Sequence, residues 1–582
     1  MPIAPHDNSA VNPSQDYSVA EIFAVRGINT NENALSLNTE ELTVFENFML
    51  GPRHMKRRAG SALIGTDPGS ITKVIGLGSL EQDSGVTLLF LGNNGDLYKY
   101  SGGSWAVSDK TNYDVTNDAS IITFTSKNGA SVENGTTSSG STKYILEDAS
   151  KTWVPGAYKG KCVVIRGETK YIIDNDVIRL FLSDRLNRET DSDYQTQTYN
   201  IYAVDPQAFI ANGVDFVQKY NLTTHVPLDG THVTSGEALT KFRYLVAHQG
   251  RMWGLRGLGN ENDRAFISDV AVGEQFTKDT NLNINLSFFN DGDEVTGGVS
   301  MPLRDGSVLL VSKNNSVHSV EGDNVLNYVV HSRFTKSGNI APKTLKVSGR
   351  SAFMLGFDGV LRFSGDGTSD LLERPIPISE PIAAEIAAFS EADRRAACAE
   401  VFDNKYFLCI GSTMYVYDII ESIKREQHLW STLEFPWTFN FLHAAGNALY
   451  AGSKTTGQVY QLLTGTTDDG TRITATMETA LITAPGAPTM YVPRVEVQAD
   501  KNASVVLRIA VAVDGGAYGT YITATLDADL GIYRFPIELR GTSFKFKLLD
   551  NYTGTAVKIA MPIRILYSID SYGLRETKGD LS

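Results

Sequence analysis

The chain has 582 residues, more than one hydrophobic core normally serves, so two to four domains are expected. Its residues are 42% hydrophobic and 10% aromatic, which allows packed cores and excludes wholesale disorder. The 52 basic and 66 acidic side chains give a net charge of −14. This net negative charge argues against a protein that binds nucleic acid through its phosphates, although nucleic acid could still slide past such a surface.

The N-terminus, the apolar runs and the cysteines indicate the cellular compartment of the protein. The first residues lack the basic start and apolar core of a secretory signal. No apolar run approaches the roughly 18 residues of a membrane span, so we expect no stable membrane insertion. Cys162, Cys398 and Cys409 show no pairing pattern and no CxxC spacing, which predicts buried, unpaired thiols in a protein made in a reducing cytosol.

Residues 1–60 are interpreted as an N-terminal arm and a first propeller segment. The first 20 residues are polar and contain proline, as is typical of an arm. The dense basic patch of the chain follows, and it consists of Arg53, Lys56, Arg57 and Arg58. Two interpretations stay open for these four residues: a solvated loop, or a docking contact with an adaptor, a neighbouring subunit or nucleic acid phosphates.

A hairpin pattern then recurs along the chain. Each copy has an apolar strand, a turn rich in Gly, Asn or Asp, and a short apolar and aromatic strand. Clear copies lie at Leu88–Tyr100, Tyr244–Leu255, Val308–Val320 and Ala352–Phe363, with looser copies at Tyr406–Tyr417 and Ala448–Leu462. The later copies are spaced as propeller blades are, roughly every 45–50 residues. We therefore predict a first blade in residues 61–115 and the remaining blades in residues 207–465.

The long gap between the first two copies predicts an insertion in residues 116–206. Three strand-like runs with short turns lie there, Lys161–Arg166, Lys170–Ile173 and Val177–Leu182. Such strands form a small β-barrel or sandwich. One helix is predicted among the later blades, Ser379–Phe389, with Ser379 as its N-cap. Residues 466–582 alternate as strands with Gly and Asp turns, which predicts a C-terminal β-sandwich-like domain. The expected fold class is all-β.

Motifs that carry chemistry are not found. The nine histidines are scattered, and neither a zinc motif, a nucleophile elbow nor a phosphate loop occurs. The acidic run Asp291–Glu294 lacks the ligand alternation of a calcium loop and is interpreted as a solvated turn. Four tryptophans are assigned to core packing rather than to a stacking platform: Trp105, Trp253, Trp430 and Trp437. We expect no catalytic residue, no cofactor, no metal and no enzyme activity.

Several short motifs resemble a known family. Gly27–Thr30 reads Gly-Ile-Asn-Thr, Leu37 is followed by Glu41, and Asn47 precedes Phe48. Residues 56–60 end in Arg-Ala-Gly where that family has Arg-Pro-Gly. In the insertion, Asp148–Trp153 precedes Gly160–Val163. The motifs of residues 27–60 resemble the tail nozzle (tail hub, or tail tubular protein B) family of short-tailed bacteriophages, and the motif of the insertion is similar to a small β-domain found in phage structural proteins.

The resemblance implies a structural protein of the virion tail, synthesised in the host bacterial cytoplasm. Members form a homohexameric ring below the portal and the tail adaptor. The ring continues the DNA channel, retains the packaged genome, and conducts double-stranded DNA out without sequence-specific binding. Its flanks carry fibres, spikes or a needle. Two alternatives stay open: a carbohydrate-binding or carbohydrate-cleaving propeller of a receptor-binding tail protein, and a non-viral propeller that serves as an interaction platform.

Overall fold

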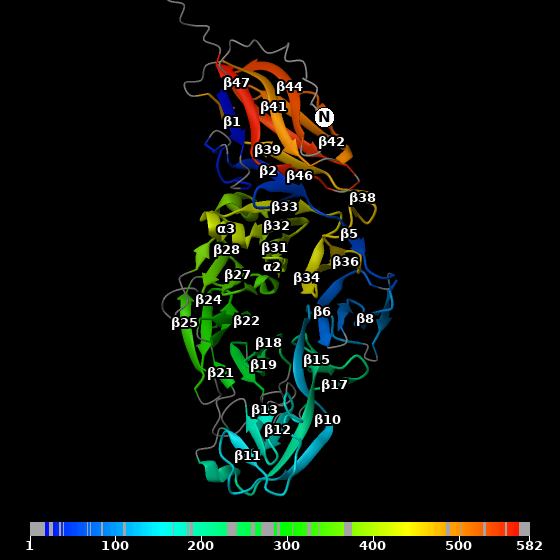
Figure 1. Cartoon of the computed structure of the whole chain (residues 1–582), viewed down its shortest axis with the longest axis vertical. Coiled ribbons are helices and arrows are strands. Elements are labelled where there is room, and N and C mark those ends of the chain that lie inside the picture. Colours follow the sequence, from blue (N-terminus) through cyan, green and yellow to red (C-terminus); the bar gives the residue numbers. More distant parts are fainter. Residues whose placement is uncertain are drawn as a thin grey trace, which may run out of the picture.

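Three β-rich parts follow one another along the long axis of the molecule (Figure 1). The computed structural model describes residues 18–569 apart from internal gaps, of which the longest are 230–240, 269–284 and 366–374. A β-propeller lies in the middle, a C-terminal β domain at one end, and a small inserted domain at the other. In the described residues no helix is both long and apolar enough to cross a membrane.

Five blades of the propeller are each built from four consecutive strands. The first contains β6 (Val74–Gln82), β7 (Gly85–Gly92), β8 (Leu97–Ser101) and β9 (Ser104–Val107). The third contains β18 (Tyr244–His248), β19 (Arg251–Leu255), β20 (Arg264–Ile267) and β21 (Asn285–Ser287). The fourth contains β22 (Val295–Leu303), β23 (Gly306–Lys313), β24 (Ser316–Glu321) and β25 (Val329–Thr335). The fifth contains β26 (Lys346–Ser348), β27 (Ser351–Gly356), β28 (Gly359–Ser364) and β29 (Ile376–Pro377). The sixth contains β30 (Cys398–Phe402), β31 (Lys405–Ile410), β32 (Thr413–Asp418) and β33 (Trp430–Glu434).

Two further blades are completed by segments distant in the sequence. The second combines β10 (Ser120–Thr136), β15 (Thr198–Ala211), β16 (Gln218–Tyr220) and β17 (His225–Pro227). The seventh combines β34 (Phe439–Ala445), β35 (Ala448–Ser453) and β36 (Val459–Leu462) with β5 (Ser61–Leu63) from near the N-terminus. The first strands of the seven blades contact one another in succession, and β34 contacts β6, so the ring closes. Among the described residues the propeller therefore has seven blades.

The inserted domain interrupts the second blade between its first two strands. β10 and β15 pair along their whole length, but the register shifts between Asn128 and Glu133. Beyond that irregularity the outer halves of both strands leave the blade, and β15 continues into the order β11-β14-β13-β12-β15. The added strands are β11 (Ile145–Glu147), β12 (Cys162–Ile165), β13 (Glu168–Asn175) and β14 (Arg179–Leu182). The predicted boundaries 116–206 were thus too wide, because residues 120–128 and 203–206 within that range lie in strands of the second blade.

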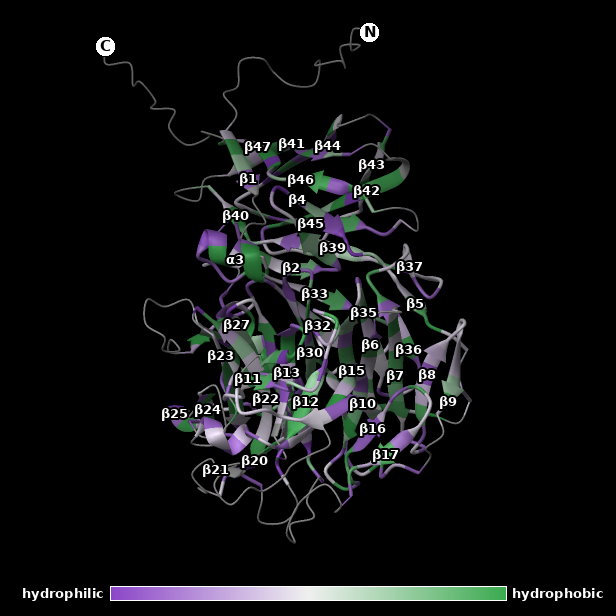
Figure 2. Ribbon diagram, turned by 60° about the horizontal axis from the view of Figure 1, so that its bottom comes forward, coloured by the Kyte–Doolittle hydropathy of each residue, from purple (hydrophilic) through white to green (hydrophobic). Residues whose placement is uncertain are grey.

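The described part of the N-terminal segment, which begins at residue 18, places its strands in the two sheets of the C-terminal domain, and this corrects the prediction of a first propeller segment there. Residues 1–17, most of the predicted arm, lie outside the described residues. One sheet runs β1-β47-β41-β46-β4-β3, with β44 on β41. The other runs β2-β39-β45-β42-β43, with β40 on β45, and β2 also pairs with β33 of the sixth blade. β1 and β47, the first and last described strands, lie side by side at this end (Figure 2). The N-terminal strands are β1 (Ser18–Ile22), β2 (Leu42–Glu46), β3 (Phe48–Leu50) and β4 (His54–Arg57). The C-terminal strands are β39 (Ala475–Thr479), β40 (Ile482–Thr483), β41 (Met490–Ala499), β42 (Asn502–Val513), β43 (Ile522–Leu526), β44 (Gly531–Gly541), β45 (Ser543–Asp550), β46 (Lys558–Ala560) and β47 (Ile563–Ile569).

The short helical elements lie mainly between propeller strands. They are η1 (Asp191–Tyr194), η3 (Pro342–Thr344), η4 (Glu380–Ile382), α1 (Ala383–Ala388), α2 (Glu391–Ala396) and α3 (Ile419–Arg425). The predicted helix Ser379–Phe389 is therefore η4 followed by α1. Ser379 is the N-cap residue, as predicted, but its side chain makes no capping hydrogen bond, and its hydroxyl accepts a hydrogen bond from the Val360 amide at 2.9 Å.

Candidate functional site

The basic patch of the sequence divides into two exposed and two buried side chains. Arg53 and Lys56 are exposed on the β3–β4 hairpin. Arg57 and Arg58 are both only 2% exposed. Successive side chains of a strand point to opposite faces, so Lys56 faces solvent while Arg57 faces the interior.

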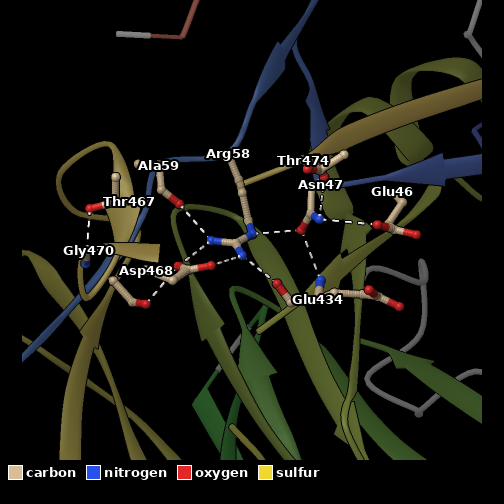
Figure 3. A network of polar contacts seen from close by, with 10 residues as sticks. Glu46, Asn47, Arg58, Ala59, Glu434, Thr467, Asp468, Gly470 and Thr474 are labelled. Atoms are coloured by element: carbon tan, nitrogen blue, oxygen red, sulfur yellow. Dashed lines mark hydrogen bonds and ion pairs between the residues drawn. The ribbon is translucent and has the colours of Figure 1, made fainter. Parts of the chain in front are cut away.

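Arg58 lies at a junction of three segments (Figure 3). Its guanidinium donates to both carboxylate oxygens of Asp468, at 2.8 and 2.5 Å, and Nε donates to Asn47 Oδ1 at 2.8 Å. It also donates to the carbonyl of Glu434 and lies 4.0 Å from the centre of the Phe435 ring. Asn47 follows β2, Glu434 ends β33, and Asp468 lies in β37 (Thr467–Asp468), next to β38 (Thr471–Arg472). One side chain thus joins the N-terminal segment, the sixth blade and β37, which extends the sheet of the seventh blade.

Arg57 makes a second buried ion pair, inside the C-terminal domain. Its Nη1 donates to Asp550 Oδ1 at 3.2 Å and to the carbonyl of Tyr552, and its Nη2 donates to the carbonyl of Gly554 at 2.6 Å. Burial raises the pKa of the Asp550 carboxyl, and the charge of Arg57 opposes that effect. The ion pair holds the β4 end against the β45–β46 connection.

Both sequence interpretations are therefore wrong for Arg57 and Arg58. These side chains are neither solvated nor free to dock, because carboxylates of their own chain occupy them. The sequence carried a partial signal, since strand alternation places Arg57 opposite Lys56. The sequence carried no signal for the partner carboxylates, Asp550 and Asp468, which follow Arg57 and Arg58 by 493 and 410 residues. Of the patch, only Arg53 and Lys56 are placed to contact another molecule.

A cavity lined by described residues lies at the centre of the propeller. It has a volume of about 620 Å³ and is lined by the first strands of all seven blades. Leu77, Val246, Val299 and Phe441 are among its apolar lining residues. Sequence reasoning could not identify this cavity, because it exists only once the ring has closed.

A polar cluster lies in the wall of this cavity. Asp118 accepts from Lys343 at 2.8 Å, from Lys73 at 3.3 Å and from the Asn440 amide at 3.1 Å. Lys343 also donates to Asn440 Oδ1 at 2.7 Å. Burial by itself would raise the pKa of Asp118, but the two ammonium groups and the hydrogen bonds outweigh it and lower the pKa. The cluster is an ionised carboxylate held by two cations.

The acidic run of residues 291–294 forms local contacts. Asp291 lies outside the described residues. Asp293 accepts from the Asn314 side chain at 3.1 Å and from the Asn315 amide at 2.9 Å, and Glu294 pairs with Arg256. In the part of the chain that the structure describes, no three His, Cys, Asp or Glu side chains are grouped to hold a metal ion.

The aromatic and thiol side chains are structural. Trp253 and Trp430 are fully buried, which confirms core packing for both. Trp105 donates to the Ile64 carbonyl at 2.7 Å, and Trp437 stacks on Tyr460 at 3.9 Å between ring centres. The three cysteines, Cys162, Cys398 and Cys409, are buried and form no disulfide, as predicted.

Comparison with known proteins identifies no family for this chain. No protein-family model matches it, and no curated protein matches it in sequence. Solved structures with a matching arrangement include BamB from Moraxella catarrhalis, at 9% identity and a TM-score of 0.33, covering 71% of this chain and 92% of that chain. BBS1N, solved in complex with ARL6DN, has 11% identity and a TM-score of 0.35, covering 71% and 99%. An exo-beta-1,3-galactanase from Phanerochaete chrysosporium has 9% identity and a TM-score of 0.23, covering 88% and 99%. The propeller assignment rests on the closed ring of sheets described above.

Proposed function

We propose that this chain is a structural subunit of the tail nozzle of a short-tailed bacteriophage. In this role six copies form a ring below the portal and the tail adaptor. The ring retains the packaged genome and then conducts double-stranded DNA during ejection. The observation that supports this role best is the way in which residues 27–63 join the propeller to the C-terminal domain.

That junction is a shared sheet rather than a linker. β2 lies between β33 of the sixth blade and β39 of the C-terminal domain, so one sheet continues from one part into the other. β5 then closes the seventh blade. Domains connected by a simple linker are expected to move relative to each other, whereas a continuous hydrogen-bonded sheet resists such motion. A stiff subunit suits a ring that bears the pressure of a packaged genome.

The net negative charge of the chain supports the proposed conduction of DNA during ejection. A net charge of −14 gives a surface that repels phosphate on average, so a duplex would slide along the ring rather than stick to it. A channel ringed by lysine and arginine would contradict this part of the proposal. The inserted domain, at the far end from the C-terminal domain (Figure 1), is a suitable attachment point for fibres, spikes or a needle.

Assembly tests the proposal directly. The purified chain, alone and mixed with the portal and adaptor of the same virion, is measured by native mass spectrometry. We expect a ring of six copies with the adaptor, even where the free chain is a monomer. A chain that stays monomeric with the adaptor and is missing from purified particles would favour the non-viral interaction platform.

The two exposed residues of the basic patch give a sharper test of docking. Arg53→Glu combined with Lys56→Glu should abolish attachment to the adaptor, because both side chains are exposed on one hairpin. Lys159→Glu, an exposed lysine of the inserted domain, is the matched control. If the double variant assembles as the wild type does, Arg53 and Lys56 are solvated residues that do not contact the adaptor.

The carbohydrate alternative has a separate test. Incubation with host polysaccharide, followed by analysis for released oligosaccharides, should show no release if the chain is a nozzle subunit. Release would favour a carbohydrate-cleaving propeller. Retention of polysaccharide without cleavage would favour a receptor-binding one.

A further inference from the structure

One mouth of the propeller cavity gathers positive charge in an acidic protein. Its lining carries one carboxylate, Asp118, and six cations, which are Lys73, Arg243, Lys343, Lys346, Arg395 and Lys454. Glu400 and Glu391 pair with Lys346 and Arg395, each at 2.8 Å. Counting these two, six cations face three carboxylates, which leaves three positive charges. The chain as a whole carries −14.

The topology explains why these cations lie at the same mouth. The first strands of the blades surround the cavity and run in the same direction, so the residues at their starts meet at one end. Lys73 directly precedes β6, Arg243 directly precedes β18, and Lys346 begins β26. Arg395 lies three residues before β30.

Lys454 reaches this mouth from the neighbouring strand of its blade. It follows β35, and its backbone amide donates to the Thr438 carbonyl just before β34. The start of β22 differs, because Asp293 and Glu294 lie there. Asp293 is held by two asparagines, Glu294 is paired with Arg256, and neither lines the cavity.

The fold already shows how this mouth binds a carboxylate. Asp118 is held by Lys73, Lys343 and Asn440, so three blades supply its ligands. Arg243 and Lys454 are not engaged with any carboxylate in the described structure. The Arg243 guanidinium donates to the Asn212 carbonyl at 3.3 Å and lies 5.9 Å from the centre of the Tyr244 ring, and Lys454 is exposed. These two side chains can therefore take up additional anionic groups.

The cavity behind the charged mouth selects the kind of ligand. Its volume of about 620 Å³ is within the range of pockets that enclose small organic groups. Its wall includes Leu77, Val299 and Phe441 together with the small Ala247. A nucleic acid duplex presents phosphates on a rigid cylinder and has no flexible apolar group to insert. An extended peptide can place carboxylates at the rim and one apolar side chain inside.

We propose that this mouth binds a short acidic peptide segment of a partner protein, with an apolar side chain inserted into the cavity. The glutamate or aspartate side chains contact Arg243 and Lys454, and the Asp118 cluster keeps Lys73 and Lys343 in place. The site is separate from the Arg53–Lys56 hairpin, and it does not depend on assembly into a ring.

A fluorescein-labelled pentapeptide with four glutamates around a central leucine is a suitable probe. Fluorescence anisotropy with the full chain should show saturable binding that weakens as salt rises. Arg243→Glu combined with Lys454→Glu should weaken binding by about tenfold or more. Lys159→Glu makes the same change of charge at an exposed site elsewhere and should leave affinity unchanged.

A second variant tests the cavity without altering charge. Ala247→Trp places an indole in the cavity and should also weaken binding by about tenfold, because the leucine can no longer enter. Circular dichroism confirms that each variant folds. The proposal is overturned by no binding to the wild-type chain, by equal binding to all variants, or by tighter binding of a short DNA duplex that is lost in the same charge variant. The last result would assign the mouth to nucleic acid.

Discussion

Arg58 shows how one buried charge can organise a large β protein. Its five donors reach Asn47, Asp468, the Glu434 carbonyl and the Ala59 carbonyl, so little of its hydrogen-bonding capacity is unused. Buried ion pairs add little net stability, but removing one partner leaves the other charge unpaired and desolvated. The network therefore specifies how the segments are arranged, and it makes the junction sensitive to substitution.

Arg58→Met should lower the free energy of unfolding by about 3–5 kcal/mol, because Asp468 is then left buried without its partner. Urea unfolding followed by tryptophan fluorescence measures the change. Lys56→Met, an exposed neighbour, should cost less than about 0.5 kcal/mol. Adding Asp468→Leu to Arg58→Met should restore part of the loss. Equal effects at positions 56 and 58 would contradict the structural role.

His248 should make the propeller sensitive to mild acid. Burial lowers the pKa of His248 from 6.5 to about 4, so the folded state keeps the imidazole neutral. In the unfolded chain His248 takes up a proton below about pH 6.5, whereas in the folded chain it does not. The free energy of unfolding is therefore unaffected by His248 above that pH and decreases as the pH falls toward 4. The loss at pH 5 is about 2 kcal/mol.

His248→Gln should reduce the fall in stability by up to about 1.4 kcal/mol per pH unit between pH 6 and 4.5. Urea unfolding at several pH values provides the comparison. The same variant at pH 8 is the control, because the ring is neutral in both states there and only lost contacts contribute. If the free energy of unfolding depends on pH equally in the variant and the wild type, the pKa of His248 is not lowered by folding.

At the scale of elements, the two strands that count most are short and come from the N-terminal segment. β5 pairs with β36 through Ser61, Ala62 and Leu63, and it thereby completes the last blade. β2 connects two sheets that would otherwise be separate. A ring closed by a strand from the other end of the chain cannot open without breaking that pairing, so β5 adds to the closure that the contact of β34 with β6 already provides.

Ala62→Pro should weaken this closure by about 2–3 kcal/mol, because proline removes a backbone donor and is excluded from paired strand interiors. Thermal unfolding and limited proteolysis measure the effect, and new cleavage sites should appear in blades one and seven. Ala62→Thr keeps the donor and suits a strand, so it is the control. If both variants behave like the wild type, β5 does not close the ring.

At the scale of the whole molecule, the inserted domain is separable. Its hydrophobic core is distinct from the core of the blade and includes Leu146, Trp153, Val163, Ile172, Leu180 and Tyr199. The blade has its own cores on either side of β10 and β15. The two long strands connect the parts, the Tyr171 hydroxyl donates to the Thr125 carbonyl beside them at 3.5 Å, and the irregularity between Asn128 and Glu133 marks the boundary.

Deleting residues 129–202 should therefore leave the propeller intact. Asn128 pairs with Ala203, so an Asn-Gly turn can join them as a hairpin. Calorimetry should show loss of one unfolding transition with the others retained, and the deleted segment expressed alone should fold. A deletion variant that does not fold would show that the inserted domain supports the second blade. If it folds and assembles with the adaptor but no longer carries fibres, the attachment role of the insertion is supported.

The sequence by itself determined the all-β class, the repeated hairpins, an insertion after the first blade and a distinct C-terminal part. These features depend on strand alternation and turn residues, which are local properties of the chain. The buried thiols and the packing of Trp253 and Trp430 followed from the same kind of reasoning. The helix at Ser379–Phe389 and its N-cap residue were placed correctly, but the Ser379 hydroxyl makes no capping hydrogen bond and accepts one from the Val360 amide instead.

Only the tertiary structure decided where the N-terminal segment belongs, how the ring closes and what the basic patch does. Each of these depends on pairing across several hundred residues, as in β5 with β36, β2 with β39, and Arg58 with Asp468. Local sequence carries no information on such partners, because a strand edge or a guanidinium can pair with many equivalent groups. The charged mouth of the cavity arises in the same way, since the ring brings together side chains that are scattered from Lys73 to Lys454 along the chain.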